Sequence, residues 1–421
     1  MTDMQRASLW RHRRFLRYWS ALTISRFGSE MTFLALPLTA VILLEATPVE
    51  MGLLAALGTL PYLLIGLPAG VWVDRWPRQW ILVTADGIRA LALAAVPMAA
   101  LLNLLTIQQL YGVAFVVGVL TTFSDITEEA FLPALIGRQK LVEGYSRLAA
   151  SGSVVEIVGP GLAGLLLQIL SAPFVLAIDA VTFVVSALLL GSIRTEQRTQ
   201  SASGAGGDLK TFVGEMAEGL RYLFRHMLLR PMVLTAGTLQ FFGGMFDALL
   251  ILYLSEQVGL TPTAIGALYM AGSISGLMAA ATSERIVARI GTGPVHVLGA
   301  FLIGLGMLGT GLAGGDPLPV FVLIASVRFI QGIGNTWFNI TYSSIVQTTT
   351  PDALLGRINA SDRFIGMGAL PVGAFLGGVL ATQVGTRPTL ILAGVGGFVA
   401  FLWLIRSPLL KLRSVVAPES D

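Results

Sequence analysis

The chain has 421 residues, of which 54% are hydrophobic and 12% are charged, and its formal net charge is +3. Soluble domains carry about 25% charged residues, so this chain has too few charges to cover an ordinary water-facing surface. The absence of cysteine excludes disulfides, thiolate metal sites and cysteine nucleophiles. Together with a mean hydropathy of +0.77, the composition indicates an integral membrane protein that crosses the bilayer many times.

Apolar runs close to the ~20 residues that cross a bilayer recur along the whole chain. Glycine, proline and clusters of charge divide these runs into twelve candidate helices. The sequence therefore predicts an all-α polytopic membrane protein with spans at residues 18–44, 50–73, 80–102, 108–133, 146–169, 173–192, 231–255, 262–283, 293–313, 318–346, 358–383 and 388–406.

The spans fall into two groups of six on either side of a polar segment. We expect an N-terminal six-helix bundle at 1–192, a cytoplasmic linker at 193–230, a C-terminal six-helix bundle at 231–406 and a cytoplasmic tail at 407–421. From Asp208 onward, the linker has apolar residues at helical spacing. That pattern indicates an amphipathic helix, either on the membrane surface or solvated.

Lysine and arginine are unevenly distributed between the loops. If the N-terminus is cytoplasmic, one set of loops receives nearly all of the basic residues and the opposite set contains only Arg387. Because basic loops remain on the cytoplasmic side, we expect both termini and the linker to lie inside a plasma membrane, which in bacteria is the cytoplasmic membrane. The basic residues are thus topology signals rather than a nucleic-acid site.

The two halves of the chain resemble each other. RFGSEMTFLALPL at 26–38 matches FFGGMFDALLILY at 241–253, which aligns two Phe-Gly pairs. Further on, VEMGLLAALG at 49–58 matches TAIGALYMAG at 263–272 with two glycines in almost the same register. Two repeated bundles of six helices form an architecture that suits alternating access.

The loop between the second and third spans, GVWVDRWPRQ, carries the most specific motif. It resembles the signature G-x-x-x-D-R-x-G-R-R/K of the major facilitator superfamily, although Pro77 replaces a glycine and Gln79 replaces the last basic residue. The matching residues, which the resemblance implies act in gating, are Gly70, Asp74, Arg75 and Arg78.

The fifth span contains VEIVGPGLAG, which partly resembles the antiporter signature of the same superfamily at Gly159, Pro160 and Gly164. Four further stretches are similar to its drug:proton antiporter branch, which includes macrolide-efflux proteins and the enterobactin exporter. These stretches are ADGIRALALAAVP, FLPALIGRQKLVEG, IDAVTFVVSALLL and QTTTPDALLGRINA. The resemblance implies multidrug efflux, antibiotic resistance and gating at Gly159 and Pro160.

The reaction that this branch implies is export of an amphipathic compound by alternating access, driven by inward movement of protons. The implied partners are that compound, protons and the lipid bilayer, with no cofactor and no metal, and a monomer suffices for the fold. Two other transport reactions stay open, which are proton-linked import of a small solute and flipping of a lysophospholipid. A seventh span rich in Phe and Met favours an apolar or amphipathic cargo.

Charged residues inside spans identify candidate coupling groups. A charge at mid-bilayer costs about 2.5–3.5 kcal/mol or more, so it usually faces a water-filled cavity or a partner. Proton coupling needs a carboxylate that desolvation brings toward neutrality. The candidates are Glu30, Asp247 and Asp125. A fixed Arg26–Glu30 pair would instead keep Glu30 ionised, and Asp125 and its acidic neighbours could pair with Arg138 or Arg147.

Polar and aromatic residues concentrate in the first, fourth, seventh and tenth spans, which are the helices that line the central cavity in the superfamily fold. The predicted cavity residues are Arg26, Gln240, Phe241, Met245, Arg328, Gln331, Asn335, Trp337 and Asn339. Other buried polar residues fit hydrogen-bonded networks between helices. These are Asp86, Arg89, Glu156, Asp179, Thr182 and Ser186.

An enzyme is excluded as the main reading. The chain has three histidines, and none of them lies in an H-E-x-x-H motif. Neither G-x-S-x-G nor G-x-x-x-x-G-K occurs, so the hydrolase elbow and the phosphate-binding loop are absent from the sequence. ATP-driven transport is therefore not expected.

Overall fold

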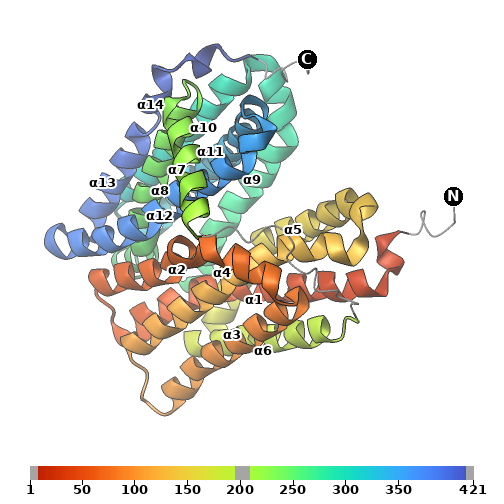
Figure 1. Cartoon of the computed structure of the whole chain (residues 1–421). Helices are drawn as coiled ribbons and strands as arrows, with labels where there is room; N and C mark the ends of the chain where they lie inside the picture. The colour runs from red at the N-terminus through yellow and green to blue at the C-terminus, as the bar shows by residue number, and fades with distance from the viewer. Residues whose placement is uncertain (1–7, 195–208, 414–421) are drawn as a thin grey trace. The chain divides into compact units, whose positions relative to one another are not determined.

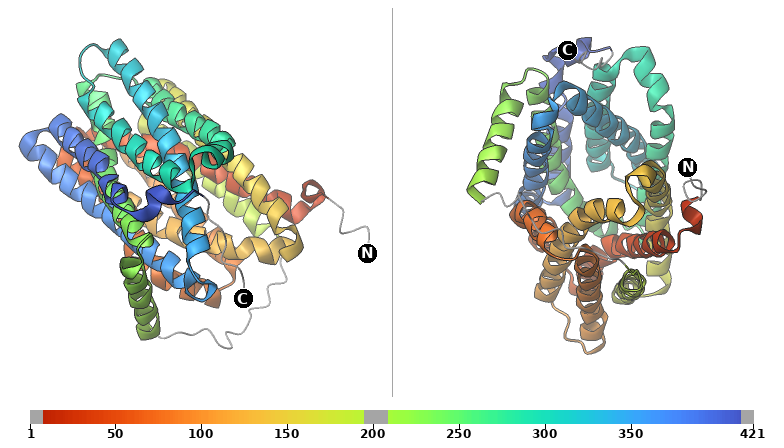
Figure 2. Two further views of the ribbon diagram at one scale, coloured as in Figure 1. Left: turned by 90° about the horizontal axis from the view of Figure 1, so that it is seen from above. Right: turned by 45° about the vertical axis from the view of Figure 1, so that its right-hand side comes forward.

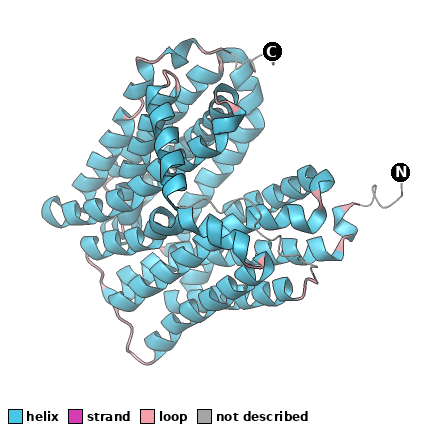
Figure 3. Cartoon of the chain, in the orientation of Figure 1, coloured by secondary structure: helices cyan, strands magenta, loops and turns pink. Residues whose placement is uncertain are grey.

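A computed structural model describes residues 8–194 and 209–413 of the chain. Across these two ranges the regular structure is helical and contains no strand (Figure 3). Twelve helices within them are long and apolar enough to cross a bilayer. The predicted all-α fold with twelve spans is therefore confirmed.

The described residues divide into two compact units. The first contains those of 1–44 and 61–206, and the second contains those of 45–60 and 207–421. The division falls within helix α2 (Pro48–Arg75), because the beginning of α2 packs against helices of the second unit. At this contact, a Cβ added to Gly52 would lie only 2.7 Å from the carbonyl oxygen of Ala374. Small residues of this kind let two helices approach closely in a membrane.

The first unit is built from long helices that run side by side. Helix α6 contacts both α1 and α3, while α4 packs on α3 and α5 packs on α1 (Figure 1). A buried apolar cluster, which includes Phe15, Tyr18 and Phe131, joins the start of α1 to the end of α4. The remaining helices of this unit are α1 (Arg13–Leu44), α3 (Arg78–Leu101), α4 (Ile107–Ile136), α5 (Leu141–Ile169) and α6 (Ala172–Gly191).

In the second unit α10 contacts α11 and α13, α8 contacts α12 and α13, and α9 contacts α11 (Figure 2). Glycines again bring the backbones together: a Cβ at Gly373 of α12 would lie 1.8 Å from the carbonyl oxygen of Phe241 in α8. The helices are α7 (Leu209–Arg225), α8 (Leu229–Leu252), α9 (Pro262–Ile290), α10 (Thr292–Leu312), α11 (Pro317–Thr349), α12 (Asp352–Val384), α13 (Thr386–Val399) and α14 (Leu402–Ile405).

The observed helices differ from the predicted spans mainly at their ends. Helix α1 begins at Arg13 rather than at residue 18, and the last predicted span is divided into α13 and α14. A π-helical turn at Tyr253–Gln257 extends α8 beyond the predicted end of the seventh span. Apolar runs mark the part of a helix that suits the bilayer, whereas backbone hydrogen bonds continue into the polar flanks.

The linker contains the expected helix, α7, and this helix is docked on the first part of α12. Arg357 of α12 forms an ion pair with Glu218, with 2.7 Å between Nη1 and Oε2. The Ser361 hydroxyl donates a hydrogen bond to the carbonyl oxygen of Met216 at 3.1 Å. Leu223 is fully buried in the same unit. Helix α7 is therefore held by specific contacts with α12.

Gly219 is the position at which α7 approaches α12 most closely. A Cβ there would lie 2.5 Å from the carbonyl oxygen of Arg357 and 2.4 Å from the Ser361 hydroxyl, whereas a Cβ at Gly214 would meet nothing within 4 Å. We expect Gly219→Ala to cost about 1–3 kcal/mol by overpacking and to increase hydrogen exchange in α7. Gly214→Ala is the matched control and should leave exchange unchanged or slower. Equal exchange in the two variants would contradict this docking.

Candidate functional site

The first candidate site is a set of charged side chains on α1, α4 and α5 of the first unit. Arg26 of α1 forms an ion pair with Glu128 of α4, with 3.1 Å between Nη2 and Oε2. Both side chains remain partly accessible, at 43% and 20%. The expected intrahelical partner, Glu30, is not the residue that Arg26 contacts. Arg26 thus links two helices that the sequence predicts to line a cavity.

Glu30 lies on the side of α1 that faces α5. Its side chain covers Gly159: a Cβ at this glycine would lie 2.7 Å from both Cβ and Cγ of Glu30. In the described ranges no hydrogen bond or ion pair of Glu30 is found, and the charged group that acts on it is Glu156 of α5, which is exposed. Glu30 is a half-buried carboxylate whose charged neighbour has the same sign.

Asp125 is exposed on α4 and accepts a hydrogen bond from the hydroxyl group of Tyr62 in α2. The sequence places Asp125 and Glu128 near Arg147, but Arg147 instead pairs with Glu143, one turn away on the same helix. Spacing of i, i+4 makes this local pair accessible without any tertiary contact. The carboxylates of α4 are therefore available to α1 and α2.

The residues of the predicted gate lie at the end of α2, the start of α3 and the middle of α5. Arg75 is the exposed last residue of α2, and Gly70 has open space where a Cβ would stand. Arg78 begins α3 and donates a hydrogen bond to the carbonyl oxygen of Ala130 in α4, at 3.3 Å. The side chain of Asp74 lies outside the described part of the structure.

Gly159 and Pro160 are both buried inside α5, which continues through them. Of the two, Gly159 has the clearer role, because it leaves room for Glu30 against the α5 backbone.

The second candidate site lies on α8, α9 and α11 of the second unit. Arg328 of α11 donates a hydrogen bond to the Gln331 side chain at 3.1 Å. Its guanidinium group lies over the ring of Tyr269 in α9, 4.7 Å from the centroid, which is a cation–π distance. Asp247 of α8 is exposed and lies within electrostatic reach of Arg328. This unit therefore places one carboxylate and one arginine on different helices near each other.

The other predicted cavity residues are divided between accessible and packed positions. Asn335 and Asn339 are exposed on α11, and the amide of Asn339 donates to the carbonyl oxygen of Asn335 at 2.8 Å. The Trp337 indole donates to the carbonyl oxygen of Ala279 in α9 at 3.3 Å. Met245 is buried against Gly377 of α12. Gln240 and Phe241 are half-buried on α8.

Several polar contacts were not anticipated from sequence. Tyr62 and Tyr269 are isolated tyrosines in apolar runs, and nothing in their spacing indicates the partners that they contact. Asp362 of α12 accepts a hydrogen bond from Tyr342 of α11. The ring of His296 in α10 stacks on Phe338, with 4.3 Å between ring centroids. Only the acidic residue in the eleventh span, INASDRF, offered a signal that could have found its site.

A buried polar network joins α3 to α4 and α6, as the sequence predicts. Arg89 pairs with Asp86 on α3, with 3.3 Å between Nη1 and Oδ1, and donates to the carbonyl oxygen of Leu120 at 2.7 Å. The Ser186 hydroxyl of α6 donates to Asp86 at 2.6 Å. Asp86 and Arg89 are only 5% and 6% exposed. Glu156, which the sequence also places in such a network, is instead exposed.

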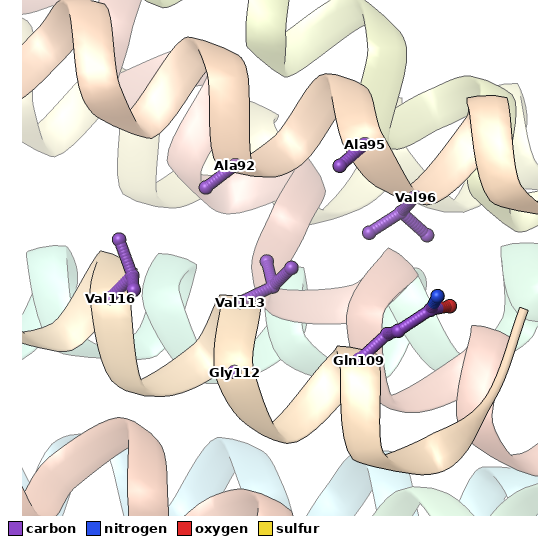
Figure 4. Close-up of a pocket in the computed structure, with 7 residues that line it drawn as sticks. All are labelled: Ala92, Ala95, Val96, Gln109, Gly112, Val113 and Val116. Atoms are coloured by element: carbon purple, nitrogen blue, oxygen red, sulfur yellow. The ribbon is translucent and has the colours of Figure 1, made fainter.

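A cavity of about 300 Å³ lies between α3 and α4 (Figure 4). Its lining is apolar apart from one amide, and consists of Ala92, Ala95, Val96, Gln109, Gly112, Val113 and Val116. It offers neither a proton acceptor nor a charged partner for a cargo, so we do not assign the function to it. Among the described residues, no cluster of three or more His, Asp or Glu side chains could hold a metal ion.

Comparison with known proteins gives consistent results. The chain is 29% identical to the multidrug efflux pump Tap of Mycolicibacterium fortuitum over 406 residues, covering 93% of each protein. It is 26% identical to macrolide efflux protein A of Streptococcus pyogenes, covering 93% of this chain and 95% of that protein.

Among solved structures, the fold is similar to the nucleoside transporter NupG, with a TM-score of 0.72, 15% identity and coverage of 93% of this chain and 99% of the other. It is also similar to a bacterial homologue of the iron transporter ferroportin, with a TM-score of 0.73, 17% identity and coverage of 94% and 98%. The model of the Major Facilitator Superfamily matches residues 18–360 and 232–419. The chain is an integral membrane transporter that belongs to the Major Facilitator Superfamily.

Proposed function

We propose that the protein exports an amphipathic compound in exchange for protons, by alternating access, across the bacterial cytoplasmic membrane. The names of the two efflux relatives support export, and the aromatic side chains of α8 suit a cargo with apolar surface. The uneven distribution of basic loops supports an orientation with both termini in the cytoplasm. Inward movement of protons would then drive the cargo outward.

The arrangement of Arg26, Glu128 and Glu30 is the observation that carries the coupling assignment. Because Arg26 pairs with Glu128, it does not hold Glu30 in its ionised form. Glu30 is half-buried, has an acidic neighbour and lacks a cationic partner among the described residues. A carboxylate in such surroundings binds a proton more readily than an exposed one. We assign proton exchange to Glu30, and assign a second, parallel role to Asp247.

Arg328 has a role that complements these carboxylates. It is held by Gln331 and Tyr269 and attracts Asp247, so protonation of Asp247 would leave the arginine without its counter-charge. We propose that cargo and proton compete in this way for the same charged groups. The gating role of Asp74, Arg75 and Arg78 remains part of the proposal.

Transport into proteoliposomes tests the function directly. Purified protein is reconstituted, a pH gradient is imposed and uptake of macrolides, fluorescent dyes, siderophores and lysolipids is measured. We expect accumulation of at least one amphipathic compound that collapses when an ionophore dissipates the gradient. Accumulation that is insensitive to the ionophore, or transport restricted to lysolipids or to small polar solutes, would reject the proposal.

Gly159 gives a further prediction, because it makes the space that Glu30 occupies. A Cβ at Gly159 would displace Glu30, whereas a Cβ at Gly152 would make an ordinary contact at 3.5 Å with Arg26. Misplacing a reacting group by about 1 Å can lower a rate by up to about 100-fold. We expect Gly159→Ala to slow gradient-driven transport by at least about 10-fold and to shift its pH profile, and Gly152→Ala to do neither. Identical pH profiles for both variants would contradict the assignment.

A further inference from the structure

Asp179 of α6 is a fully buried carboxyl group, at 0% exposure, that is not part of either candidate site. One of its oxygens accepts a hydrogen bond from the Thr32 hydroxyl of α1, and the other accepts one from Thr182 at 2.9 Å. It occupies the space left by Gly28, since a Cβ on this glycine would lie 2.0 Å from Oδ1 of Asp179. Asp179 therefore fills the contact between α1 and α6.

The charged groups that act on Asp179 are Asp86 and Arg89, both on α3. These two residues form an ion pair with each other, and the second terminal nitrogen of Arg89 bonds to Leu120 and Ser124 rather than to Asp179. Its Nε has no hydrogen-bond partner. The only cation near Asp179 is thus already neutralised by another carboxylate.

The remaining charged groups on helices packed around Asp179 are directed elsewhere. On α1, Arg26 pairs with Glu128 of α4 and Glu30 lies over α5. On α5, Glu156 is exposed and acts on Glu30. The described surroundings of Asp179 therefore supply hydroxyl groups, glycine and apolar side chains, but no cation of its own.

Charge balance then decides the state of the group. The buried network contains two carboxyl groups and one guanidinium, so full ionisation would leave one negative charge without a counter-charge. A buried carboxylate without a cation takes up a proton rather than remain ionised. Threonine hydroxyls can both donate and accept hydrogen bonds, so Thr32 and Thr182 suit a neutral carboxylic acid as well as a carboxylate.

We propose that Asp179 is a proton-binding site that holds a resident proton at neutral pH and thereby joins α1 to α6. This site is separate from Glu30, which lies on the α5 side of the same helix. Loss of the proton would leave an anion against Gly28 and two hydroxyl groups. The proton can therefore leave only when α1 moves away from α6 or when water enters this contact.

Infrared difference spectroscopy tests the protonation state. We expect wild-type protein at neutral pH to show the carbonyl stretch of a protonated carboxylic acid that Asp179→Asn lacks. The double variant Asp86→Asn/Arg89→Met should retain this band, because it removes a neutral pair. Thr32→Val, which removes one hydrogen bond and keeps the side-chain shape, should shift the band without abolishing it. This variant also provides the test if Asp179→Asn does not fold.

A second measurement uses the pH dependence of stability. In the unfolded chain an aspartate has a pKa of about 3.9 and is ionised at neutral pH, so unfolding releases the proton that the folded site holds. Stability should therefore fall as pH rises. Between about pH 6 and about pH 8, the melting temperature of wild type should decrease more steeply than that of Asp179→Asn.

Two results would overturn the proposal. One is a wild-type spectrum that contains no acid band attributable to Asp179, judged by its absence from the difference against Asp179→Asn and by no shift in Thr32→Val. The other is a melting temperature whose pH dependence is the same in wild type and Asp179→Asn. Neither measurement depends on the cargo or on the direction of transport, so failure here is distinct from failure of the export proposal.

Discussion

Glu30→Gln is expected to abolish accumulation of cargo driven by a pH gradient while preserving exchange of labelled for unlabelled cargo. Glutamine keeps the size and hydrogen-bonding capacity of a protonated glutamate but cannot release a proton. The variant should therefore bind cargo and change conformation, yet be unable to use the gradient. Both activities are measured in the same proteoliposomes, with and without the gradient.

Glu156→Gln is the matched control for this experiment. Glu156 acts on Glu30 electrostatically but is exposed on α5, so its neutralisation should alter the pH profile of transport and keep accumulation. Asp247→Asn should resemble Glu30→Gln if the second unit carries a parallel coupling group. Undiminished accumulation in both Glu30→Gln and Asp247→Asn would remove the coupling assignment.

Arg89→Met is expected to have the largest effect on stability. This change leaves Asp86 buried at 5% exposure with a serine hydroxyl but no counter-charge. Removing one member of a buried ion pair typically costs about 3–5 kcal/mol. Thermal unfolding of the purified protein, together with the yield of folded protein, measures this loss.

The double variant Asp86→Asn/Arg89→Met supplies the control, because it removes both charges. A buried pair replaced by neutral groups is often nearly neutral in stability, so the double variant should recover most of the loss. A single variant as stable as wild type, or a double variant less stable than Arg89→Met, would show that this pair is not the main electrostatic contact of α3.

The sequence predicts the fold well because each span must satisfy its backbone hydrogen bonds within a long apolar helix. The buried Asp86–Arg89 pair was also accessible, since two opposite charges three residues apart in an apolar run have few other partners. Neither inference needs any knowledge of how the helices pack.

The partner of Arg26 could not be predicted in the same way. Spacing along α1 is equally compatible with an intrahelical pair to Glu30, and only the register of α1 against α4 selects Glu128. The docking of α7 depends similarly on Gly219 meeting Arg357 and Ser361. Tyr62 and Tyr269 gain their meaning only from Asp125 and Arg328, which lie far away in the sequence. Such pairings are tertiary, whereas periodicity reports single helices.

Proton flux caused by the cargo tests the central claim most directly. Proteoliposomes containing the wild-type protein and an internal pH indicator are loaded with a transported compound, and its efflux down a concentration gradient is started without any imposed pH gradient. Antiport predicts that protons enter as the cargo leaves, so the interior acidifies in wild type and does not in Glu30→Gln. Cargo efflux from wild-type vesicles at the full rate with no change of internal pH would contradict proton-coupled export.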